Sequence, residues 1–491
     1  MTRRLAHELH ASVAARDWAG AAQALSGLSA QCGKAAARRE LAALPFVHAD
    51  VLAALASDAS KARKNAARLL SATGTAADVP ALSAALARER TRFVVPSLLL
   101  ALGAIGGSAA HEALLAFVPP APQAPGEEKH CAAILAAHET ALMRLMPPPT
   151  VELHALRAPR AVLLRCPAGF SDALLAQLAA HGMDGRAAAG GVLLEAVRDL
   201  DALFAARCFF EALLPCGRVP LEPEAVARAA RPGWEALCGA DAAGAPALPY
   251  RIELRRYAGD RAAFLHAVAA ALGGQNRPGG YAWELRVSCT ADGQALVSVK
   301  PSDAPDARFA YRKAALPASI HPAMAAALAQ AAAMRLPGRT GLRIYDPCCG
   351  SGTLLVEAAK ALDCAALCGT DVSPAAVRAA RTNLAAAGLP AQLLQRDCRR
   401  FAPSAPFDLV LSNLPFGNRV GSHAGNEALY RGLAVRLPAL LAPGALAVLY
   451  TMEGRLLERC LGAQPGLAVL DVVRTEAGGL CPRALFCTRR P

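Results

Sequence analysis

The feature that most constrains the fold is a regular alternation of short apolar runs and helical segments that begins at Leu342. The apolar runs are typical of strands buried on both faces of a sheet. They comprise 342–346, 366–371, 391–397, 407–413 and 445–451. The last stretch, 467–489, contains two more strands joined by a Gly-containing connection. Residues 311–491 are therefore predicted to form a doubly wound, Rossmann-like α/β sheet that ends in an antiparallel hairpin.

A glycine-containing loop follows the first of these strands. The strand ends at Asp346, and the sequence PCCGSGT continues to Thr353, where a helix is predicted to begin. Ligands of such sheets bind at the carboxyl ends of the strands. Gly350 and Gly352 allow the backbone to approach a ligand because they lack a Cβ atom. The loop has neither the third glycine of a dinucleotide fingerprint nor the Gly-Lys-Ser/Thr of a P-loop. It is therefore not predicted to hold a pyrophosphate.

Acidic residues also end the next two strands. Asp371 ends the second strand and Asp397 ends the third. A carboxylate at the second position can accept hydrogen bonds from both hydroxyls of a ribose. A carboxylate at the third position can accept one from an adenine amine. Together with Asp346, these acids indicate a site for an adenosine that carries no phosphate.

Two motifs resemble those of a known enzyme family. DPCCGSGT, 346–353, is similar to the cofactor loop of class I S-adenosylmethionine-dependent methyltransferases, in the D-P-x-C-G-S-G-T form of RNA enzymes that methylate amino groups. SNLPFG, 412–417, resembles the N-[PL]-P-[FY]-G motif of the same enzymes, and 311–329 resembles the lead-in to their catalytic domain. The most similar family that these motifs indicate is the tRNA guanine-N2 methyltransferases, whose members often carry a THUMP RNA-binding domain. The resemblance is clear over 310–491, faint over 151–310 and absent over 1–145.

The resemblance implies S-adenosylmethionine as the cofactor and the exocyclic N2 of guanine in tRNA as the methylated group. The residues that it implies for cofactor binding are Asp346, Pro347, Cys348, Gly350, Gly352, Thr353, Asp371, Val372, Asp397, Cys398 and Asn413. The sequence departs from the family at two positions. Cys348 stands where relatives often have a bulky or aromatic residue. Leu414 replaces a commoner proline, which favours the guanine-N2 enzymes over the adenine-N6 and glutamine-N5 enzymes.

The resemblance also implies catalytic roles for Asn413, Leu414, Pro415 and Phe416. An exocyclic amine is a poor nucleophile because its lone pair is delocalised into the base. The Oδ1 of Asn413 and the carbonyl of Leu414 would accept its two hydrogens and direct the lone pair at the methyl group. Pro415 would fix the turn because it lacks an N–H group. Phe416 would stack on the flipped base.

The segment after this motif is expected to contact the substrate. Gly417 and Arg419 are predicted substrate-binding residues, with Arg419 meeting a phosphate. We interpret 417–433 as a Gly-rich loop that can close over the substrate. It also carries His423, which is expected to be solvated, and Tyr430.

The first 145 residues are predicted to be helices joined by short turns. A weak repeat is visible, in which Gly74 matches Gly106 and Leu82 matches Leu114. Helix pairs of this kind are stabilised by stacking on their neighbours. We therefore expect a HEAT-like helical repeat domain over 1–145, with an irregular helical bundle as the alternative.

The apolar run 93–118 lies within this helical region. Pro96, the Gly106-Gly107 pair and Glu112 interrupt it. A membrane span needs about 20 consecutive apolar residues. We therefore expect two buried helices and no membrane span.

A mixed pattern follows the proline-rich linker 146–150. Strands are expected on both sides of a helix at 170–182, and a further strand, a helix at 261–272 and a hairpin turning at Asp292-Gly293 come later. We interpret the Pro- and Ala-rich stretch near 215–248 as a second joint. The region 151–310 is therefore predicted to be an α+β module. The family resemblance implies that this module is THUMP-like and docks RNA.

The charge and the cysteines indicate the partners and the compartment. The net charge is +13, and +7 of it lies in 331–491, which has 18 Lys and Arg against 11 Asp and Glu. Such a balance suits a nucleic acid. The 15 cysteines include no CxxC pair, so we expect free thiols in a reducing, cytoplasmic compartment and no zinc site. The first 20 residues contain no continuous apolar core, so a signal peptide is not expected.

We expect RNA, above all tRNA, as the partner, a further protein partner on the helical repeats, and no membrane. Two alternatives stay open. One retains the chemistry and changes the substrate to adenine N6 in rRNA or DNA, or to a glutamine amide in a protein. The other is a non-catalytic helical-repeat scaffold with a degenerate methyltransferase domain.

Overall fold

The structure is a computed structural model that describes residues 1–33, 35–122, 126–145, 152–277, 279–316, 319–416, 423–476 and 480–490. The chain divides into two compact units. The first unit consists of Met1–Val151, Asp241–Glu253 and Ala269–Glu284. The second unit consists of Glu152–Ala240, Leu254–Val268 and Leu285–Pro491.

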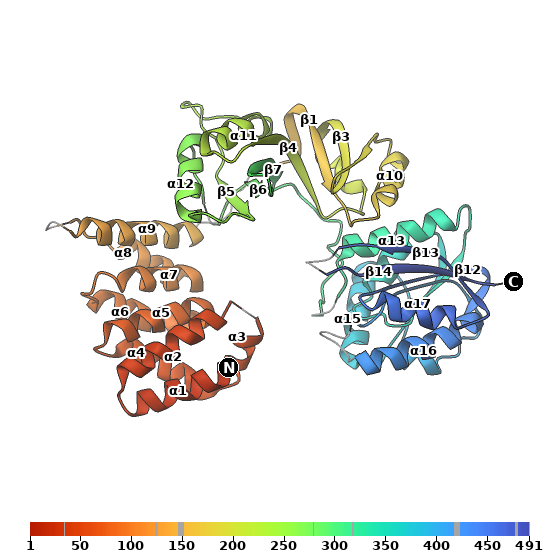
Figure 1. Cartoon of the computed structure of the whole chain (residues 1–491), viewed down its shortest axis with the longest axis horizontal. Coiled ribbons are helices and arrows are strands. Elements are labelled where there is room, and N and C mark those ends of the chain that lie inside the picture. Colours follow the sequence, from red (N-terminus) through yellow and green to blue (C-terminus); the bar gives the residue numbers. More distant parts are fainter. Residues whose placement is uncertain are drawn as a thin grey trace. The chain divides into compact units, whose positions relative to one another are not determined.

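Helices stack one on the next through residues 2–145, the red and orange part of Figure 1. They are α1 (Thr2–Ala14), α2 (Trp18–Gln31), α3 (Ala35–Ala42), α4 (Pro45–Ala56), α5 (Ser60–Thr73), α6 (Val79–Arg88), α7 (Val95–Ile105), α8 (Ser108–Ala116) and α9 (Glu128–Leu145). One continuous apolar cluster lies between them. Gly103 brings two of these helices together closely, since a Cβ atom there would lie 2.6 Å from the Cα of Ala141.

The glycines and leucines of the weak repeat occupy equivalent places. Gly74 ends α5 and Gly106 ends α7, while Leu82 and Leu114 are fully buried. The apolar run 93–118 is divided between α7 and α8, as expected. Among the described residues, no helix is long and apolar enough to cross a membrane. The HEAT-like character of the repeat stays a prediction.

A seven-stranded sheet follows, in the order β2-β3-β1-β4-β7-β6-β5. Its elements are β1 (Ala155–Arg165), α10 (Ser171–Ala180), β2 (Arg186–Ala188), β3 (Gly191–Asp199), η2 (Ala202–Ala205), β4 (Glu211–Pro220), α11 (Pro223–Cys238), β5 (Tyr250–Arg255), α12 (Arg261–Leu272), β6 (Trp283–Cys289) and β7 (Gln294–Pro301). β1 pairs antiparallel with β3 and β4, and β4 pairs antiparallel with β7. The predicted hairpin turn is present, because the N–H of Thr290 donates to the carbonyl of Gln294 over 2.9 Å and Gly293 has φ +76°.

The interpretation of 215–248 as a joint is wrong for most of that stretch. β4 continues to Pro220, and α11 occupies Pro223–Cys238. Pro223 lies in the first turn of the helix, where a proline has no hydrogen bond to lose. Alanine, the other abundant residue, has the highest helix propensity. The composition of a helix was therefore mistaken for that of a linker.

The C-terminal sheet has seven strands in the order β10-β9-β8-β11-β12-β14-β13. They are β8 (Leu342–Asp346), β9 (Cys364–Asp371), β10 (Gln392–Gln395), β11 (Phe407–Asn413), β12 (Leu441–Thr451), β13 (Leu467–Arg474) and β14 (Arg483–Arg489). The first five are parallel, β14 runs antiparallel to β12, and β13 pairs antiparallel with β14. The predicted doubly wound sheet with its closing hairpin is confirmed.

Helices cover this sheet (Figure 1). They are α13 (Pro322–Arg335), α14 (Thr353–Ala361), α15 (Pro374–Ala386), α16 (His423–Leu440) and α17 (Gly454–Gly462), with the short turn η3 (Cys398–Arg400). α13 packs on α14, and α16 packs on α17. Because the strand order reverses between β8 and β11, the carboxyl ends of these two strands flank the place where a doubly wound sheet binds its ligand.

The interpretation of 417–433 as a loop is wrong from His423 onward, where α16 begins. Apolar residues recur at helical spacing in this part of the chain, and Tyr430, Leu433, Ala434 and Leu437 are fully buried. Burial of this face offsets the poor helix propensity of the glycines.

Candidate active site

Asp346 lies at the end of β8 and is only 1% exposed. Its Oδ1 accepts hydrogen bonds from the hydroxyl of Ser412 (2.7 Å) and from the N–H of Cys348 (3.0 Å). Burial raises the pKa of Asp346 to about 7, although these two hydrogen bonds act in the opposite direction. The carboxyl group therefore ties the end of β8 to β11 across the switch point of the sheet.

The loop after Asp346 depends on two glycines. Gly350 has φ +51° and Gly352 has φ +76°, a region of backbone conformation that favours glycine. A Cβ atom on Gly352 would lie 3.2 Å from the Cβ of Ala380 and from the Cδ1 of Leu384. The loop can therefore turn into α14 only with its backbone close against α15.

Asp371 at the end of β9 holds the same loop. Its Oδ2 accepts from the N–H of Gly350 (3.0 Å), and its Oδ1 accepts from the N–H of Ser373 (2.9 Å). Each carboxylate oxygen can accept a second hydrogen bond, so both remain available to a ribose. The next side chain, Val372, is apolar and 68% exposed. Val372, which directly follows Asp371, therefore offers an exposed apolar side chain that a bound ligand can cover.

Asp397 follows β10 and is bound to Arg399. The Nε of Arg399 lies 3.0 Å from each carboxylate oxygen of Asp397. A ligand amine would therefore share this carboxylate with Arg399. The neighbouring Cys398 is buried, and its hydrogen bond with Cys348 lowers the pKa of the Cys398 thiol and raises that of the Cys348 thiol. The structure thus brings together Cys348 and Cys398, which the resemblance assigned separately to the cofactor site.

The motif at 412–416 presents one buried acceptor without a partner. The Oδ1 of Asn413 is inaccessible to solvent and has no hydrogen-bond partner among the described residues. Leaving such an atom unsatisfied costs about 1–3 kcal/mol. An unsatisfied acceptor at the carboxyl end of β11 therefore indicates a position where a ligand donor is expected. Leu414 is held in place because its N–H donates to the carbonyl of Tyr450 over 2.9 Å.

Side chains from α16 and from the end of β12 support this turn. The carbonyl of Pro415 accepts from the hydroxyl of Tyr430 (2.6 Å) and from the Nδ2 of Asn426 (3.1 Å). Asn426 also donates to Glu453 (2.6 Å), and the hydroxyl of Tyr430 lies 2.6 Å from that of Thr451. Sequence reasoning missed Asn426 and Glu453 and placed Tyr430 in a loop. Their roles depend on the contact between α16 and β12, which no local pattern reveals.

Phe416 lies beside Tyr450 in an edge-to-face arrangement, with ring centroids 5.8 Å apart. The contact sets the tilt of the Phe416 ring. The predicted substrate residues Gly417 and Arg419 lie outside the described residues. His423 is 74% exposed in its side chain and bonds Glu453, in agreement with a solvated histidine.

The residues present fit S-adenosylmethionine. The groups that would hold it lie at neighbouring strand ends of one sheet. They are the glycine loop at Gly350 and Gly352, the free lone pairs of Asp371, the exposed Val372 and the unpartnered Oδ1 of Asn413. The described residues contain no cluster of His, Cys, Asp and Glu that could hold a metal ion.

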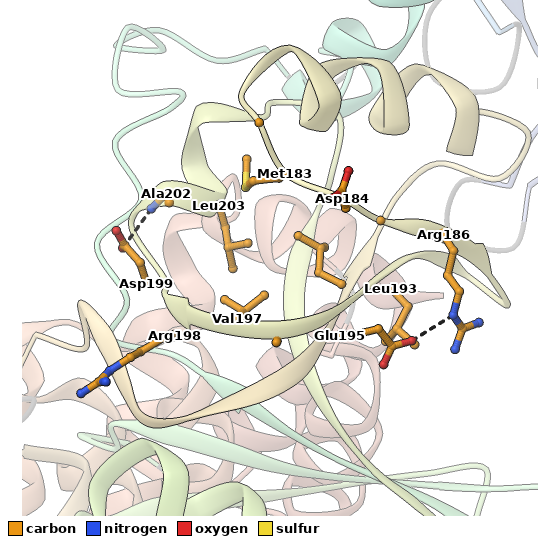
Figure 2. A pocket seen from close by; sticks show the side chains of 14 residues that line it. Met183, Asp184, Arg186, Leu193, Glu195, Val197, Arg198, Asp199, Ala202 and Leu203 are labelled. Atoms are coloured by element: carbon orange, nitrogen blue, oxygen red, sulfur yellow. Dashed lines mark hydrogen bonds and ion pairs between the residues drawn. The ribbon is translucent and has the colours of Figure 1, made fainter.

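A separate hollow of about 560 Å³ lies in the α+β module between the end of α10, β3 and η2 (Figure 2). Leu193, Val197 and Leu203 line its interior. Two of its acids are already bound, since Glu195 accepts from Arg186 and Asp199 accepts from the N–H of Ala202 (Figure 2). The hollow contains no residue of the loop 346–353 or of the motif 412–416. It is therefore not the candidate active site.

The chain is similar to a known family and to known proteins. Residues 310–482 match the family model of the RMKL-like methyltransferase domain. The chain is similar to the tRNA (guanine(6)-N2)-methyltransferase of Thermus thermophilus, with 35% identity over 195 residues that cover 39% of this chain and 56% of that protein. It is also similar to tRNA (guanine(6)-N(2))-methyltransferase THUMP3 of Homo sapiens, with 30% identity over 165 residues that cover 30% of this chain and 32% of that protein. The chain thus spans about half or less of these curated relatives.

A solved structure of TrmN from Thermus thermophilus is similar to this chain, with a TM-score of 0.54 and 27% identity. The similarity covers 67% of this chain and 99% of that one. This share is larger than the C-terminal α/β domain alone, so the likeness includes at least part of the chain before residue 311.

Proposed function

Because residues 310–482 form an RMKL-like methyltransferase domain, we propose that the protein transfers a methyl group from S-adenosylmethionine to the exocyclic N2 of guanine in tRNA. The observation that carries the proposal is the buried, unpartnered Oδ1 of Asn413 at the carboxyl end of β11. The names of the similar proteins, which are tRNA guanine-N2 methyltransferases, support guanine as the base. The net positive charge of the catalytic third supports a nucleic acid over a protein.

The roles proposed for the motif residues are those that the family resemblance implies. The Oδ1 of Asn413 accepts one hydrogen of the guanine amine, and the carbonyl of Leu414 accepts the other, so the nitrogen lone pair is turned toward the methyl group. Pro415 is held by Tyr430 and Asn426 through its carbonyl, which keeps the turn rigid. Phe416 stacks on the base, and Gly417 and Arg419 continue the substrate contact. After the transfer, the methylated nitrogen carries a positive charge and releases one of its two protons. A charged base is therefore not required at Asn413.

The cofactor residues are those of the strand ends. Asp371 would bind the ribose hydroxyls, Val372 would cover one face of the adenine, and Asp397 and Cys398 would hold the adenine edge. Asp346, Pro347, Cys348, Gly350, Gly352 and Thr353 form the loop that surrounds the methionine part. When bound, S-adenosylmethionine supplies an electrophilic methyl group. The protein contributes alignment, because holding the two reacting atoms in line can supply a large part of the rate.

We assign three functional regions to the chain. Residues 311–491 are the catalytic domain, 151–310 an α+β module that docks RNA and is THUMP-like, and 1–145 a HEAT-like domain that binds a protein partner. The free thiols of all 15 cysteines fit a reducing, cytoplasmic compartment. Support for the docking role of 151–310 is the extent of the likeness to TrmN, which reaches beyond the catalytic domain.

The test is methyl transfer from labelled S-adenosylmethionine to unmodified tRNA, rRNA fragments, DNA and protein, followed by identification of the modified nucleoside by mass spectrometry. We expect N2-methylguanosine in tRNA and its loss in Asn413→Ala. The control is S-adenosylhomocysteine binding by calorimetry, which should remain measurable in Asn413→Ala, since Asp371 and the glycine loop are intact. Label in adenine or in protein would refute guanine as the target. Cofactor binding without transfer to any substrate would favour the scaffold.

A further inference from the structure

The segment 207–210 joins η2 to β4 and lies at the junction between the α+β module and the catalytic domain. Cys208 and Phe209 are fully buried, and Phe210 is 39% exposed. The Oε1 of Gln177 accepts from the N–H of Arg207 (2.7 Å) and from that of Cys208 (3.1 Å). The first three residues of the segment are therefore fixed, and the fourth projects a ring toward solvent.

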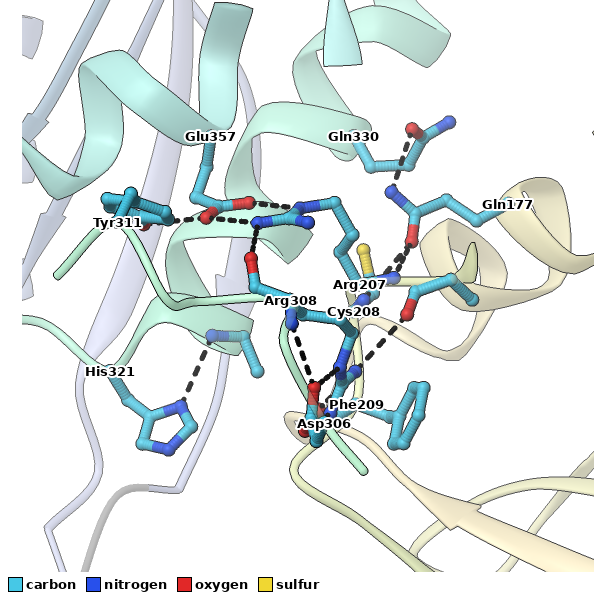
Figure 3. Close-up of polar contacts among 12 residues, drawn as sticks. Gln177, Arg207, Cys208, Phe209, Asp306, Arg308, Tyr311, His321, Gln330 and Glu357 are labelled. Carbon is cyan, nitrogen blue, oxygen red and sulfur yellow. Dashed lines mark hydrogen bonds and ion pairs between the residues drawn. The ribbon is translucent and has the colours of Figure 1, made fainter. Parts of the chain in front are cut away.

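A buried ion pair anchors this segment to the catalytic domain (Figure 3). The Nε and Nη2 of Arg207 donate to the two carboxylate oxygens of Glu357 over 2.8 and 2.9 Å. Glu357 lies on α14, directly after the cofactor loop, and its side chain is fully buried. The hydroxyl of Tyr311 also donates to Glu357 over 2.6 Å. A charge pair with this geometry is lost only at a large energetic cost, so the junction is rigid.

The connector 306–316 lies against the same segment. Arg308 is 7% exposed, donates to the carbonyls of Ala206 and Phe209 (3.2 Å each), and places its guanidinium 3.7 Å from the ring centroid of Phe209 (Figure 3). Farther along, the N–H of Ala314 donates to the Oδ1 of Asn383 over 2.8 Å. The Nδ2 of Asn383 in turn donates to the carbonyl of Ser351 in the cofactor loop over 2.9 Å. The connector therefore runs from the module to the edge of the candidate active site.

An aromatic pair lies on the surface of this junction. The rings of Phe210 and His321 are 4.9 Å apart at their centroids and meet edge to face. His321 is exposed as a residue, while its Nδ1 accepts from the N–H of Ala323 (3.2 Å) at the start of α13. Partial burial of the ring, and then the charges of Arg312 and Arg308, lower the pKa of His321. The lowered pKa favours the uncharged form of the His321 ring.

Two cations without acidic partners lie in the connector, and the charge of Arg312 acts on His321. Arg312 and Lys313 make no ion pair with any described residue, and the Nε of Arg312 is buried without a hydrogen-bond partner. By contrast, the neighbouring Arg207 and Arg308 are each paired with a carboxylate. The junction thus combines a fixed, exposed aromatic ring with uncompensated positive charge. Proteins hold single-stranded nucleic acid by stacking aromatic rings on its bases and by placing cations near its phosphates.

We propose that Phe210, His321, Arg312 and Lys313 form a platform that binds an unpaired segment of the RNA substrate beside the cofactor loop. The proposal rests on the proposed function and names the place where the RNA is held. A base stacks on Phe210, and the following phosphate meets Arg312 and Lys313. The ion pair between Arg207 and Glu357 keeps the platform at a constant position relative to the loop. The junction between the α+β module and the catalytic domain therefore sets the distance between the bound RNA segment and the target guanine.

The experiment measures binding of the full-length protein to a fluorescein-labelled, unmodified tRNA transcript by anisotropy at several salt concentrations. Phe210→Leu should weaken binding about 5- to 100-fold, as expected for the loss of one base–aromatic stack. Phe210→Trp should bind within about twofold of wild type, because tryptophan retains a stacking face. Arg312→Gln should reduce the slope of log affinity against log salt by about one, the effect of one phosphate contact. S-adenosylhomocysteine affinity should stay unchanged in all three.

The matched control is Phe93→Leu, the same substitution at a ring that is 37% exposed on the first unit, and it should leave tRNA affinity unchanged. Wild-type affinity and salt slope in both Phe210→Leu and Arg312→Gln would overturn the platform, as would weak binding by Phe210→Trp. A change of oligomeric state in Phe210→Leu would also overturn it, since a second copy would then cover the ring. If Phe210→Leu does not fold, Phe210→Trp and Arg312→Gln decide the question. A wild-type protein that binds S-adenosylhomocysteine but no RNA would instead refute the proposed function.

Discussion

The ion pair between Arg207 and Glu357 allows a quantitative prediction about stability. The side chain of Arg207 is 16% exposed, and that of Glu357 is fully buried. Arg207→Met retains an apolar stem but leaves the carboxylate of Glu357 buried, with the hydroxyl of Tyr311 still donating to it. Loss of one member of a buried pair costs about 3–5 kcal/mol, because the other charge stays desolvated. We expect the second unit to lose stability by that amount.

The assay is thermal unfolding monitored by circular dichroism. A loss of about 3–5 kcal/mol should lower the transition that reports on the second unit by roughly 6–20 °C, at about 2–4 °C per kcal/mol for a large domain. The matched control is Arg186→Met, which breaks a pair whose side chains are 64% and 65% exposed. Exposed pairs contribute about 0–1 kcal/mol, so this variant should shift the transition little.

The double variant Arg207→Met/Glu357→Gln tests the cause. It removes the buried charge as well as its partner, so it should recover part of the stability that Arg207→Met loses. Two results would show that desolvation of Glu357 does not cause the destabilisation of Arg207→Met. One is an equal fall of the transition in Arg186→Met and Arg207→Met. The other is a double variant whose loss of stability equals the sum of the losses in the two single variants.

Three further predictions concern the candidate active site. Burial raises the pKa of Asp346 to about 7, so its contribution to stability is present at acidic pH, is lost as the pH rises to about 7, and does not change further above that. Asp346→Asn should flatten this dependence in unfolding midpoints measured from pH 5 to pH 8. Gly352→Ala should weaken S-adenosylhomocysteine binding in calorimetry and destabilise the fold by about 1–3 kcal/mol, because φ +76° is strained for alanine and the new Cβ would press on Ala380. Tyr430→Phe removes the hydrogen bond to the carbonyl of Pro415 and should lower kcat about tenfold while the KM for S-adenosylmethionine stays constant, a split that general unfolding would not produce.

Much of the C-terminal α/β domain was predictable because its signals are local. A strand buried on both faces must be apolar along its whole length, so β8, β9, β11 and β12 are visible in the sequence. The glycines of the loop were predictable because the turn from β8 into α14 requires positive φ at Gly350 and Gly352. The placing of Asp346, Asp371 and Asn413 near one another was predictable for a similar reason, since they end neighbouring parallel strands that meet at one edge of the sheet.

Local signals failed where composition was misleading. The prolines and alanines of 223–238 favour a joint by composition, but Pro223 begins α11 and Trp234 is fully buried within it. The glycines around His423 favour a loop, but burial of one face of α16 outweighs their low helix propensity. In both places tertiary burial decided the outcome, which a window of sequence cannot show.

The sequence by itself determined which residue ends each strand and where the backbone needs glycine. These properties depend on neighbours along the chain and on the rule that parallel strands share an edge. Only the tertiary structure decided what holds these groups in place. These contacts join residues 11 to 150 positions apart in the chain. They are the hydrogen bonds from Tyr430 and Asn426 to the carbonyl of Pro415, and the ion pair between Arg207 and Glu357. Such contacts arise from the packing of whole elements, and the burial that makes them strong exists only once those elements are assembled.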